Sequence, residues 1–314
     1  MVKIFVPAAV KLFGEHAVVY GKPAISAAIN KGVYVECEKS DKLSIETAGY
    51  PSALRFYPGE GRVEAVGAER FFAYINAALR LAEEKWGGLA ARFYIKSELP
   101  PGAGAATSAT VSIGLLKAYA LCAGGDVEGI ELAKMGHRVE LEVQGIASPM
   151  DSTTVTLGGV LKIKTNPFSV DKLNANLPPF YIAFLPRFET TGEIVRGVKA
   201  LLERRRSAAF VIEAIGRVVE EAEQCLLNRD LECVGELMGI NNWLLGALGV
   251  VDERAINLLN AARPFIYGGK ISGAGRGGAV ILLPRSEDAL ERVLSASGYV
   301  YHKVTIYEGG VTVL

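Results

Sequence analysis

The chain has 314 residues and half of them are hydrophobic, which is enough for one large or two medium domains with a sizeable core. Its 34 basic and 34 acidic side chains balance, which argues against a nucleic-acid-binding protein, and no stretch approaches the length of a membrane span. The opening residues, MVKIFVPAAV, have no signal-peptide pattern, so we expect a soluble, cytoplasmic protein without nucleic-acid or membrane partners.

The first part of the chain mixes strand and helix patterns. Strand patterns cover residues 2–10, 29–40, 42–48 and 89–99, with Ser40-Asp41-Lys42 as the turn between the second and the third. Helix patterns cover residues 67–86, 107–122 and about 126–143. The helix at 107–122 is apolar on nearly every side, which is typical of a helix buried in a core.

The middle of the chain contains the expected domain boundary. Residues 153–164 suggest a pair of strands around Gly158-Gly159, and residues 165–178 are polar and contain prolines. We place the boundary in this polar segment, which gives an N-terminal domain of residues 1–168 and a C-terminal domain of residues 169–314.

The second part of the chain begins with a strand and contains several helices. The expected elements are a strand at 180–186, three or four helices between 191 and 262, a strand region at 270–284, a helix at 287–297, and strands at 299–307 and 310–314. Mixed helices and strands in both parts indicate two α+β domains with a cleft between them.

The four cysteines form no CxxC pair, and we expect buried free thiols at these positions: Cys37, Cys122, Cys225 and Cys233. The chain contains only two glutamines and many charged residues, a weak sign of a thermophilic source. Such a source would allow a disulfide inside the cell.

A glycine-rich loop, PPGAGAATSA at residues 100–109, joins an expected strand to an expected helix. Thr107 and Ser108 stand where a helix would begin, and the free N–H groups and dipole of a helix start favour an anion. The loop is not a Walker A motif, because no Lys-Ser/Thr pair follows, and it lacks the third glycine of a dinucleotide fingerprint. Phosphate binding and a purely structural turn both remain open from these residues alone.

Three further stretches contain candidate functional residues. A second glycine cluster, SGAGRGGA at 272–279, suggests a nucleotide held from two sides, or else a tight turn in a sheet. In GEHAVVYGKPA at 14–24, Glu15 and His16 could recognise a polar substrate or form a capped turn. In VELEVQGIASPMDSTTVTLGG at 139–159, Asp151 could be an ordinary turn residue and Glu140 a solvated helix carboxylate, while His137 is expected to pack.

Taken together, these four stretches resemble the GHMP kinase superfamily, and FGEHAVVYGKPA resembles its mevalonate kinase branch. MGINNWLLGALGV at 238–250 also resembles this group, and the motifs occur in the family order over nearly the whole chain. The resemblance implies an α+β fold of two domains, the second ferredoxin-like, with the active site in the interdomain cleft. It also implies transfer of the γ-phosphoryl group of ATP to the 5-hydroxyl of mevalonate, and it allows a homodimer.

The resemblance also implies roles for particular residues. Asp151 matches the catalytic aspartate, and Ser108 and Glu140 match the two side chains that hold Mg²⁺. The residues expected to cradle the phosphates of ATP are Pro101, Gly102, Ala103, Gly104, Ala105, Ala106, Thr107 and Ser108. The residues expected near mevalonate are Glu15, His16, Asp151, Gly273 and Ala274. These roles suit phosphoryl transfer, which depends on positioning and on stabilising charge.

The sequence departs from the family pattern at three points. The usual P-x-K-V-x-L-F-G-E-H has its lysine where this chain has Ala9, and we expect Lys11, two residues on and on the same face of the strand, to replace it as a catalytic residue. Ala105-Ala106 stand where the family has Leu-Gly, which puts the shape of the loop in doubt. Thr107 replaces the first serine and is expected to remain a fair helix cap.

Two other functions remain open at this stage. One is a kinase of the same superfamily for another small alcohol, such as phosphomevalonate, homoserine or a sugar. The other is a catalytically weak homologue that binds ATP or a metabolite, an alternative favoured only by the missing lysine at position 9.

Overall fold

The computed structural model describes residues 1–48, 56–57, 62–63, 69–100 and 104–314. The loop residues Pro101, Gly102 and Ala103, expected to bind ATP, therefore lie outside the described residues.

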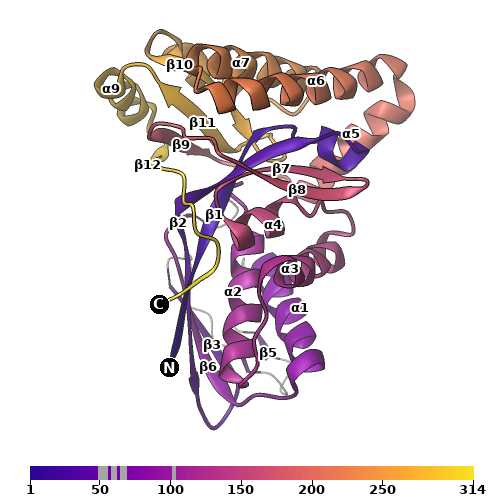
Figure 1. Ribbon diagram of the computed structural model, residues 1–314, viewed down its shortest axis with the longest axis vertical. Coiled ribbons are helices and arrows are strands. Elements are labelled where there is room, and N and C mark those ends of the chain that lie inside the picture. Colours follow the sequence, from indigo (N-terminus) through magenta and orange to yellow (C-terminus); the bar gives the residue numbers. More distant parts are fainter. Residues whose placement is uncertain (49–55, 58–61, 64–68, 101–103) are drawn as a thin grey trace.

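One large sheet forms the framework of the N-terminal part of the molecule (Figure 1). Its strand order is β13-β1-β2-β6-β3-β4-β5, and β7 pairs with β2 while β8 pairs with β7. The strands are β1 (Val2–Phe13), β2 (Ala24–Lys39), β3 (Ser44–Ala48), β4 (Phe56–Tyr57), β5 (Arg62–Val63), β6 (Ala91–Ser97), β7 (Val160–Thr165), β8 (Phe168–Leu173) and β13 (Thr312–Val313). Although β2 and β3 are consecutive, β6 lies between them, antiparallel to β2 and parallel to β3.

Four helices cover one side of this sheet in two layers: α2 (Thr107–Cys122) and α4 (Met150–Leu157) contact the strands, and α1 (Glu69–Trp86) and α3 (Gly129–Gln144) pack on these helices. The apolar pattern of α2 is explained by its position, because it packs on β1 and β2 with one side and on α1 and α3 with the other. Its residues from Ala109 to Ala120 are all buried. The sheet and these helices are called the N-terminal unit below.

The strand pair expected at 153–164 is wrong in its first half, because residues 150–157 form helix α4 and only β7 follows the two glycines. Threonine and valine favour strands, but here the helix satisfies the hydroxyl groups internally. Thr154 donates to the carbonyl of Met150 at 2.7 Å and Thr156 to that of Ser152 at 2.6 Å. Asp151 therefore lies in the first turn of a helix and is not a turn residue.

A second, antiparallel sheet has the order β10-β11-β9-β12. Its strands are β9 (Phe180–Leu185), β10 (Ile266–Ser272), β11 (Gly278–Pro284) and β12 (Val300–Val304). Its helices are α5 (Thr191–Arg204), α6 (Arg206–Asn228), α7 (Leu231–Ala247), α8 (Glu253–Ala262) and α9 (Glu287–Ser297), with 3₁₀ turns at η1 (Ala17–Tyr20) in the N-terminal unit and η2 (Arg263–Phe265) here. This sheet and helices α5–α9 are called the C-terminal unit.

The apolar run FYIAFL of β9 is buried along its whole length. Alternate residues belong to different cores: Phe180, Ile182 and Phe184 pack with β1, α6 and α7, whereas the residues between them pack with α8 and α9. A strand covered on both faces has no polar alternation, which explains its sequence pattern. Four helices between 191 and 262 and a fifth at 287–297 agree with the expected elements.

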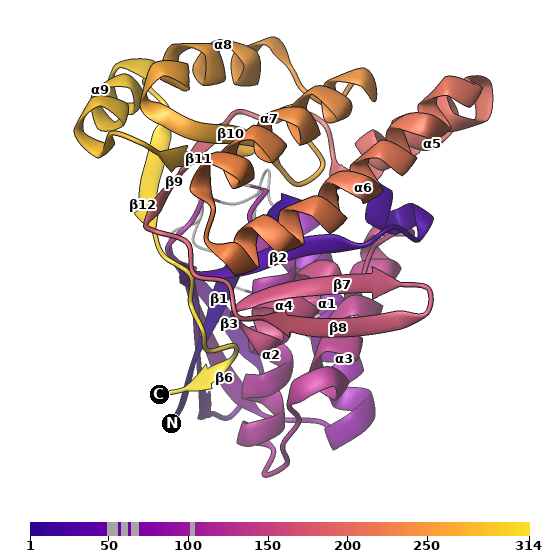
Figure 2. The same ribbon diagram turned by 45° about the horizontal axis from the view of Figure 1, so that its top comes forward.

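The chain crosses between the two units and returns. β8 pairs with β7 in the first sheet, and at the other end of the chain Val313 pairs with Ile4 of β1, so both termini lie side by side (Figure 2). The division of the chain after residue 168 stays a prediction. The first sheet contains strands from both sides of residue 168, because β8 (Phe168–Leu173) and β13 belong to it.

The expectation of free thiols is wrong, because the four cysteines form two disulfides. Cys37 of β2 is bonded to Cys122 at the end of α2, and Cys225 of α6 to Cys233 of α7. The Cα atoms of the two pairs are 6.5 Å and 5.8 Å apart, within the usual range for a disulfide. Sequence could not show this, because it does not reveal that Cys37 faces the end of α2.

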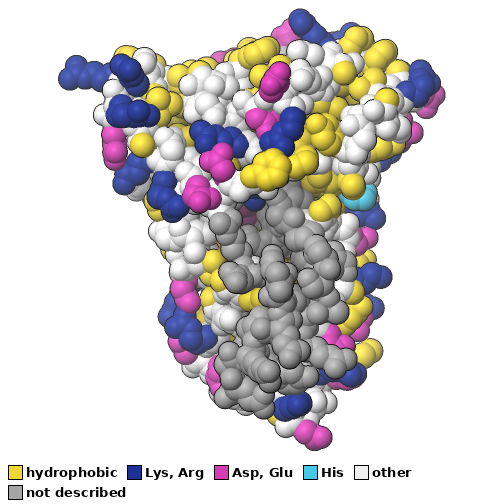
Figure 3. Space-filling view, turned by 180° about the vertical axis from the view of Figure 1, so that it is seen from behind, with side chains coloured by type: hydrophobic (Ala, Val, Ile, Leu, Met, Phe, Trp, Pro, Cys, Tyr) yellow, Lys and Arg dark blue, Asp and Glu magenta, His cyan; other side chains and the backbone are white. Residues whose placement is uncertain are grey.

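The distribution of charged side chains over the described part of the surface agrees with the balanced composition. Basic and acidic side chains are interspersed over the face opposite to that of Figure 1 (Figure 3). Among the helices that the structure describes, none combines the length and apolar character that crossing a membrane requires.

Candidate active site

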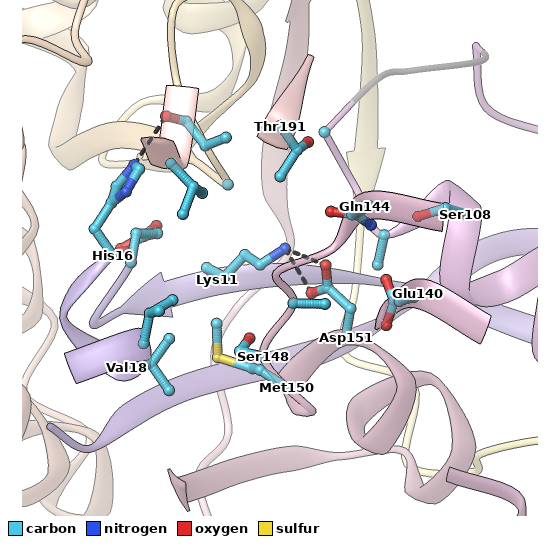
Figure 4. A pocket seen from close by; sticks show the side chains of 18 of the residues that line it. Lys11, His16, Val18, Ser108, Glu140, Gln144, Ser148, Met150, Asp151 and Thr191 are labelled. Carbon is cyan, nitrogen blue, oxygen red and sulfur yellow. Dashed lines mark hydrogen bonds and ion pairs between the residues drawn. The ribbon is translucent and has the colours of Figure 1, made fainter. Parts of the chain in front are cut away.

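A cleft lies between the two units and brings together many of the predicted residues (Figure 4). The N-terminal unit contributes the end of β1, the start of α2, the end of α3 and the start of α4, and the C-terminal unit contributes the loops after β9 and β10 and the start of α5. The predicted residues that line it are Lys11, Glu15, His16, Gly104, Ala106, Thr107, Ser108, Glu140, Asp151, Gly273 and Ala274. Ala105 does not line it, because its side chain is buried in the core.

The start of α2 opens onto the cleft. Its N-cap is Ala106, in the left-handed conformation with φ 58°, and no side chain caps the helix. Thr107 and Ser108 are the first helical residues, so the expected capping role of Thr107 is wrong. The N–H groups of the first turn are therefore not covered by a side-chain cap, and the helix dipole points at the same place. Such a helix start suits an anion.

The two glycine clusters meet in space. Gly104 has φ +77°, and a Cβ atom there would lie 2.9 Å from the nitrogen of Ala279. Gly273 has φ +99°, and a Cβ atom there would lie 3.1 Å from the carbonyl oxygen of Gly104. Because only glycine allows this approach, loops from the two units form one continuous wall of the cleft.

Lys11 and Asp151 form an ion pair in the middle of the cleft (Figure 4). The Lys11 Nζ atom lies 2.6 Å from Asp151 Oδ2 and 2.5 Å from Oδ1. The side chains are 13% and 21% exposed, so solvent and ligands can reach the pair. The backbone of Lys11 is fixed in place because its N–H donates to Ser272 Oγ at 2.9 Å.

Ala9, where the family has its lysine, shares a face of β1 with Lys11. Ala9 packs in the core that contains α2, whereas Ala8, Val10 and Leu12 pack in the core between the two units. Its backbone N–H donates to the carbonyl of Ala105 at 3.3 Å, which ties the glycine loop to β1. A lysine at 9 or at 11 would thus project from the same side of the strand.

Glu140 lies beside this pair and is buried, so its interpretation as a solvated helix carboxylate is wrong. Ser152 donates to Glu140 Oε2 at 3.0 Å. Burial, together with the charge of Asp151, raises the pKa of Glu140 to about 8, against the opposing effect of hydrogen bonds from Ser152 and Ser108. The carboxyl groups of Glu140 and Asp151 and the hydroxyl group of Ser108 therefore lie close together at the start of α2 (Figure 4).

Glu15 and His16 occupy the other end of the cleft. The Nε2 atom of His16 lies 2.9 Å from the carbonyl oxygen of Ala274, and burial lowers the pKa of this histidine to about 4. His16 is therefore neutral, and since its partner is a carbonyl, Nε2 carries the proton. Glu15 forms a fully buried ion pair with Lys270 of β10.

Sequence reasoning missed several residues at this site. Lys270 lies in β10, just before the second glycine cluster. The one feature of the sequence that could have marked it is a charged residue in a strand without any other charged residue. Tyr74 of α1 lies close to Ser108 and Gln144, and burial raises its pKa to about 12. Arg187 and Thr191 line the cleft from the segment after β9, where no motif marks them.

Comparison with known proteins identifies the family. Residues 73–159 match the GHMP kinases N terminal domain and residues 222–302 match the GHMP kinases C terminal domain. The mevalonate kinase of Saccharolobus solfataricus is 32% identical over 290 residues, which cover 91% of each chain. That of Pyrococcus horikoshii is 34% identical over 292 residues, or 88% of this chain and 87% of the other.

The chain belongs to the mevalonate kinases of the GHMP kinase family. The crystal structure of the Methanococcus jannaschii mevalonate kinase superposes with a TM-score of 0.82 at 28% identity, over 97% of this chain and 98% of that one. The expected family and the expected α+β fold of two domains are confirmed. The protein is thus an enzyme, a phosphotransferase that acts on an alcohol.

Proposed function

We propose that this enzyme transfers the γ-phosphoryl group of ATP to the 5-hydroxyl of mevalonate, forming 5-phosphomevalonate for isoprenoid biosynthesis. The observation that carries the proposal is the Lys11–Asp151 pair, which lies in the cleft between the uncapped start of α2 and the Glu15-His16 segment. This order supports the proposal, because a carboxylate there would lie between the end that binds phosphate and the end that binds the alcohol. The names of the curated relatives support the choice of mevalonate as the alcohol.

Asp151 accepts or orients the proton of the attacking hydroxyl group. A carboxylate within hydrogen-bond reach of a hydroxyl can act in this way as a general base. Lys11 holds the carboxylate in a fixed orientation and brings positive charge beside the moving phosphoryl group, where charge stabilisation contributes most. Lys11 thus takes the role of the family lysine, which this chain replaces by Ala9.

The phosphates of ATP bind at the glycine loop and the start of α2. Gly104 and the residues from Ala106 to Ser108 line the cleft, and the helix N-terminus supplies N–H groups and a favourable dipole. We assign Ala105, which stands between them, a contribution through its backbone N–H. We extend the same role to Pro101, Gly102 and Ala103, which precede it in the loop.

The residues present fit a Mg²⁺ ion. Glu140 would hold it with one carboxylate oxygen and Ser108 with its hydroxyl, which leaves positions for phosphate oxygens and water, as this ion prefers. The raised pKa of Glu140 supports the fit, because a buried carboxylate facing a second one is a site that a cation would stabilise. When bound, the ion neutralises charge on the phosphates. Among the described residues, no group of three or more His, Cys, Asp or Glu side chains could hold a metal ion, so the oxygens of the phosphates would be needed as ligands here.

Mevalonate binds between Glu15, His16, Gly273 and Ala274. His16 is held by the carbonyl of Ala274 and is neutral at physiological pH, so its Nδ1 atom is an acceptor for a substrate hydroxyl. A cytoplasmic location, a homodimer, and the absence of nucleic-acid and membrane partners stay predictions.

The test is ADP release from ATP and Mg²⁺ with mevalonate, phosphomevalonate, homoserine or galactose as acceptor. We expect turnover with mevalonate alone and a loss of about 10³-fold or more in kcat for Asp151→Asn. Asp171→Asn, which changes an exposed aspartate of β8, is the matched control and should behave as wild type. Turnover with another acceptor only would establish the alternative kinase, and ATP binding without turnover would establish the weak homologue.

A further inference from the structure

Two oppositely charged side chains are sealed at the seam between the two units. Glu15 follows β1 and is 2% exposed, and Lys270 lies in β10 and is 0% exposed. They are far apart in the sequence and come from different units, yet they form an ion pair directly behind the substrate end of the cleft.

The contacts of this pair leave one oxygen atom free. Lys270 Nζ donates to Glu15 Oε1 and, at 2.7 Å, to the carbonyl of Ile271. The other oxygen, Glu15 Oε2, is buried and has no hydrogen-bond partner among the described residues, although Glu15 lines the cleft. A buried carboxylate oxygen without a partner is costly, so it indicates a hydrogen bond that is completed by a ligand.

Neighbouring amides hold both backbones in place. Asn241 Oδ1 accepts from the N–H of Gly14 at 3.4 Å, and Asn242 Oδ1 accepts from the N–H of Ile271 at 3.1 Å. Both asparagines belong to α7 and are buried. The segments that carry Glu15 and Lys270 are therefore attached to the same helix, and the carboxylate has little freedom to turn.

Stability does not explain why the pair exists. Removing two charges from water costs about as much as their attraction returns, and an apolar pair of similar volume would often be as stable. Burial alone raises the pKa of Glu15, and the charge of Lys270 opposes this effect. Lys11 is the other cation whose charge acts on both members of the pair.

We propose that Lys270 is a positioning residue, which keeps Glu15 ionised and orients it so that Oε2 accepts a hydrogen bond from the substrate hydroxyl that is not phosphorylated. The inference rests on the proposed function and extends it by assigning the recognition of a second hydroxyl to a pair of residues. It predicts that an alcohol without this second hydroxyl is a poor substrate.

The test is a double-mutant cycle of Lys270→Met, Glu15→Gln and the double variant, with mevalonate and ATP as substrates. Each single substitution should raise the KM for mevalonate about 10-fold or more, the effect of losing a hydrogen bond to a charged group, with smaller changes in kcat and in the KM for ATP. The double variant should be no worse than the worse single variant, since both act through one hydrogen bond.

Lys162→Met is the matched control. Lys162 of β7 also forms an ion pair between the units, at 2.5 Å from Glu223 of α6, but it does not line the cleft. We expect an unchanged KM for mevalonate. An equal rise in this control would show that any ion pair between the units has the same effect, which would overturn the inference.

Other outcomes would also decide the matter. Independent, multiplicative effects of the two single substitutions on KM would overturn the inference, as would a normal KM in a folded Lys270→Met protein of lowered Tm. If Lys270→Met does not fold, the double variant, which has no unpaired buried charge, replaces it and must show the KM of Glu15→Gln. Absence of turnover by the wild type would instead refute the proposed function.

Discussion

The site contains two lysine–carboxylate pairs that differ in their access to water. The side chains of Lys11 and Asp151 are 13% and 21% exposed, whereas those of Lys270 and Glu15 are 0% and 1% exposed. An accessible pair can exchange partners with a substrate or a phosphoryl group, but a sealed pair is held in one arrangement. The same two chemical groups can therefore serve either the reaction or its geometry, depending on how deeply they are buried.

The largest effect should come from breaking the sealed pair on one side. Lys270→Met leaves an unpaired buried carboxylate and should lower the free energy of unfolding by about 3–5 kcal/mol, whereas Lys270→Met/Glu15→Gln should recover most of this loss. Lys11→Met, in the accessible pair, should cost only about 1 kcal/mol. Urea unfolding of the four proteins measures these differences. An equal loss in Lys11→Met and Lys270→Met would remove the distinction between the pairs.

Moving the lysine of the accessible pair should affect activity. Lys11→Ala should lower kcat about 10²-fold, because a cation beside the moving phosphoryl group is lost. Ala9→Lys/Lys11→Ala should regain part of the activity, since both positions lie on one face of β1. Lys3→Ala is the control and should retain full activity, because Lys3 is also on β1 but forms a partly exposed ion pair with Glu36 of β2. A kcat within a few-fold of wild type for Lys11→Ala would rule out the role of this lysine.

The third test concerns Glu140, whose charge acts on the accessible pair. Because its pKa is raised from 4.5 to about 8, the folded protein holds a proton between these pH values that the unfolded chain releases, so stability falls as the pH rises through this window. In EDTA, Glu140→Gln should therefore raise the Tm at pH 8–9 and have little effect near pH 4. Glu142→Gln, on the exposed side of the same helix, should change neither. A gain that does not depend on pH would contradict this explanation.

Sequence predicted the local elements well where one physical signal dominated. The bounds of α2 agree because a glycine loop precedes it and an apolar run fills it. The helical nature of residues 150–157 was missed because β-branched residues favour strands, and the compensating bonds of Thr154 and Thr156 depend on the helix itself. The position of β6 between β2 and β3 depends on pairing over long distances, which a local pattern does not contain.

For the site, the motifs identified residues that lie in the cleft, such as Asp151 and Ser108, because the family pattern records them. Lys270 was missed because its partner is 255 residues away and its environment is set by the packing of two units. Glu140 was underestimated for a similar reason, since helix position alone does not show that α4 and α2 cover it. Burial, which sequence shows poorly for single charged residues, decides the chemistry of both.

The placement of the two disulfides bears on how the cleft can open. Cys37–Cys122 staples the sheet to α2 inside one unit, and Cys225–Cys233 staples α6 to α7 inside the other. All four cysteines of the chain are used in this way, so no disulfide joins the two units, and the backbone passes from one to the other near residues 174–179 and 304–306. Oxidation therefore links elements within each unit, whereas contacts across the seam, such as the Glu15–Lys270 and Lys162–Glu223 ion pairs, are noncovalent, so that a change in the width of the cleft breaks no disulfide.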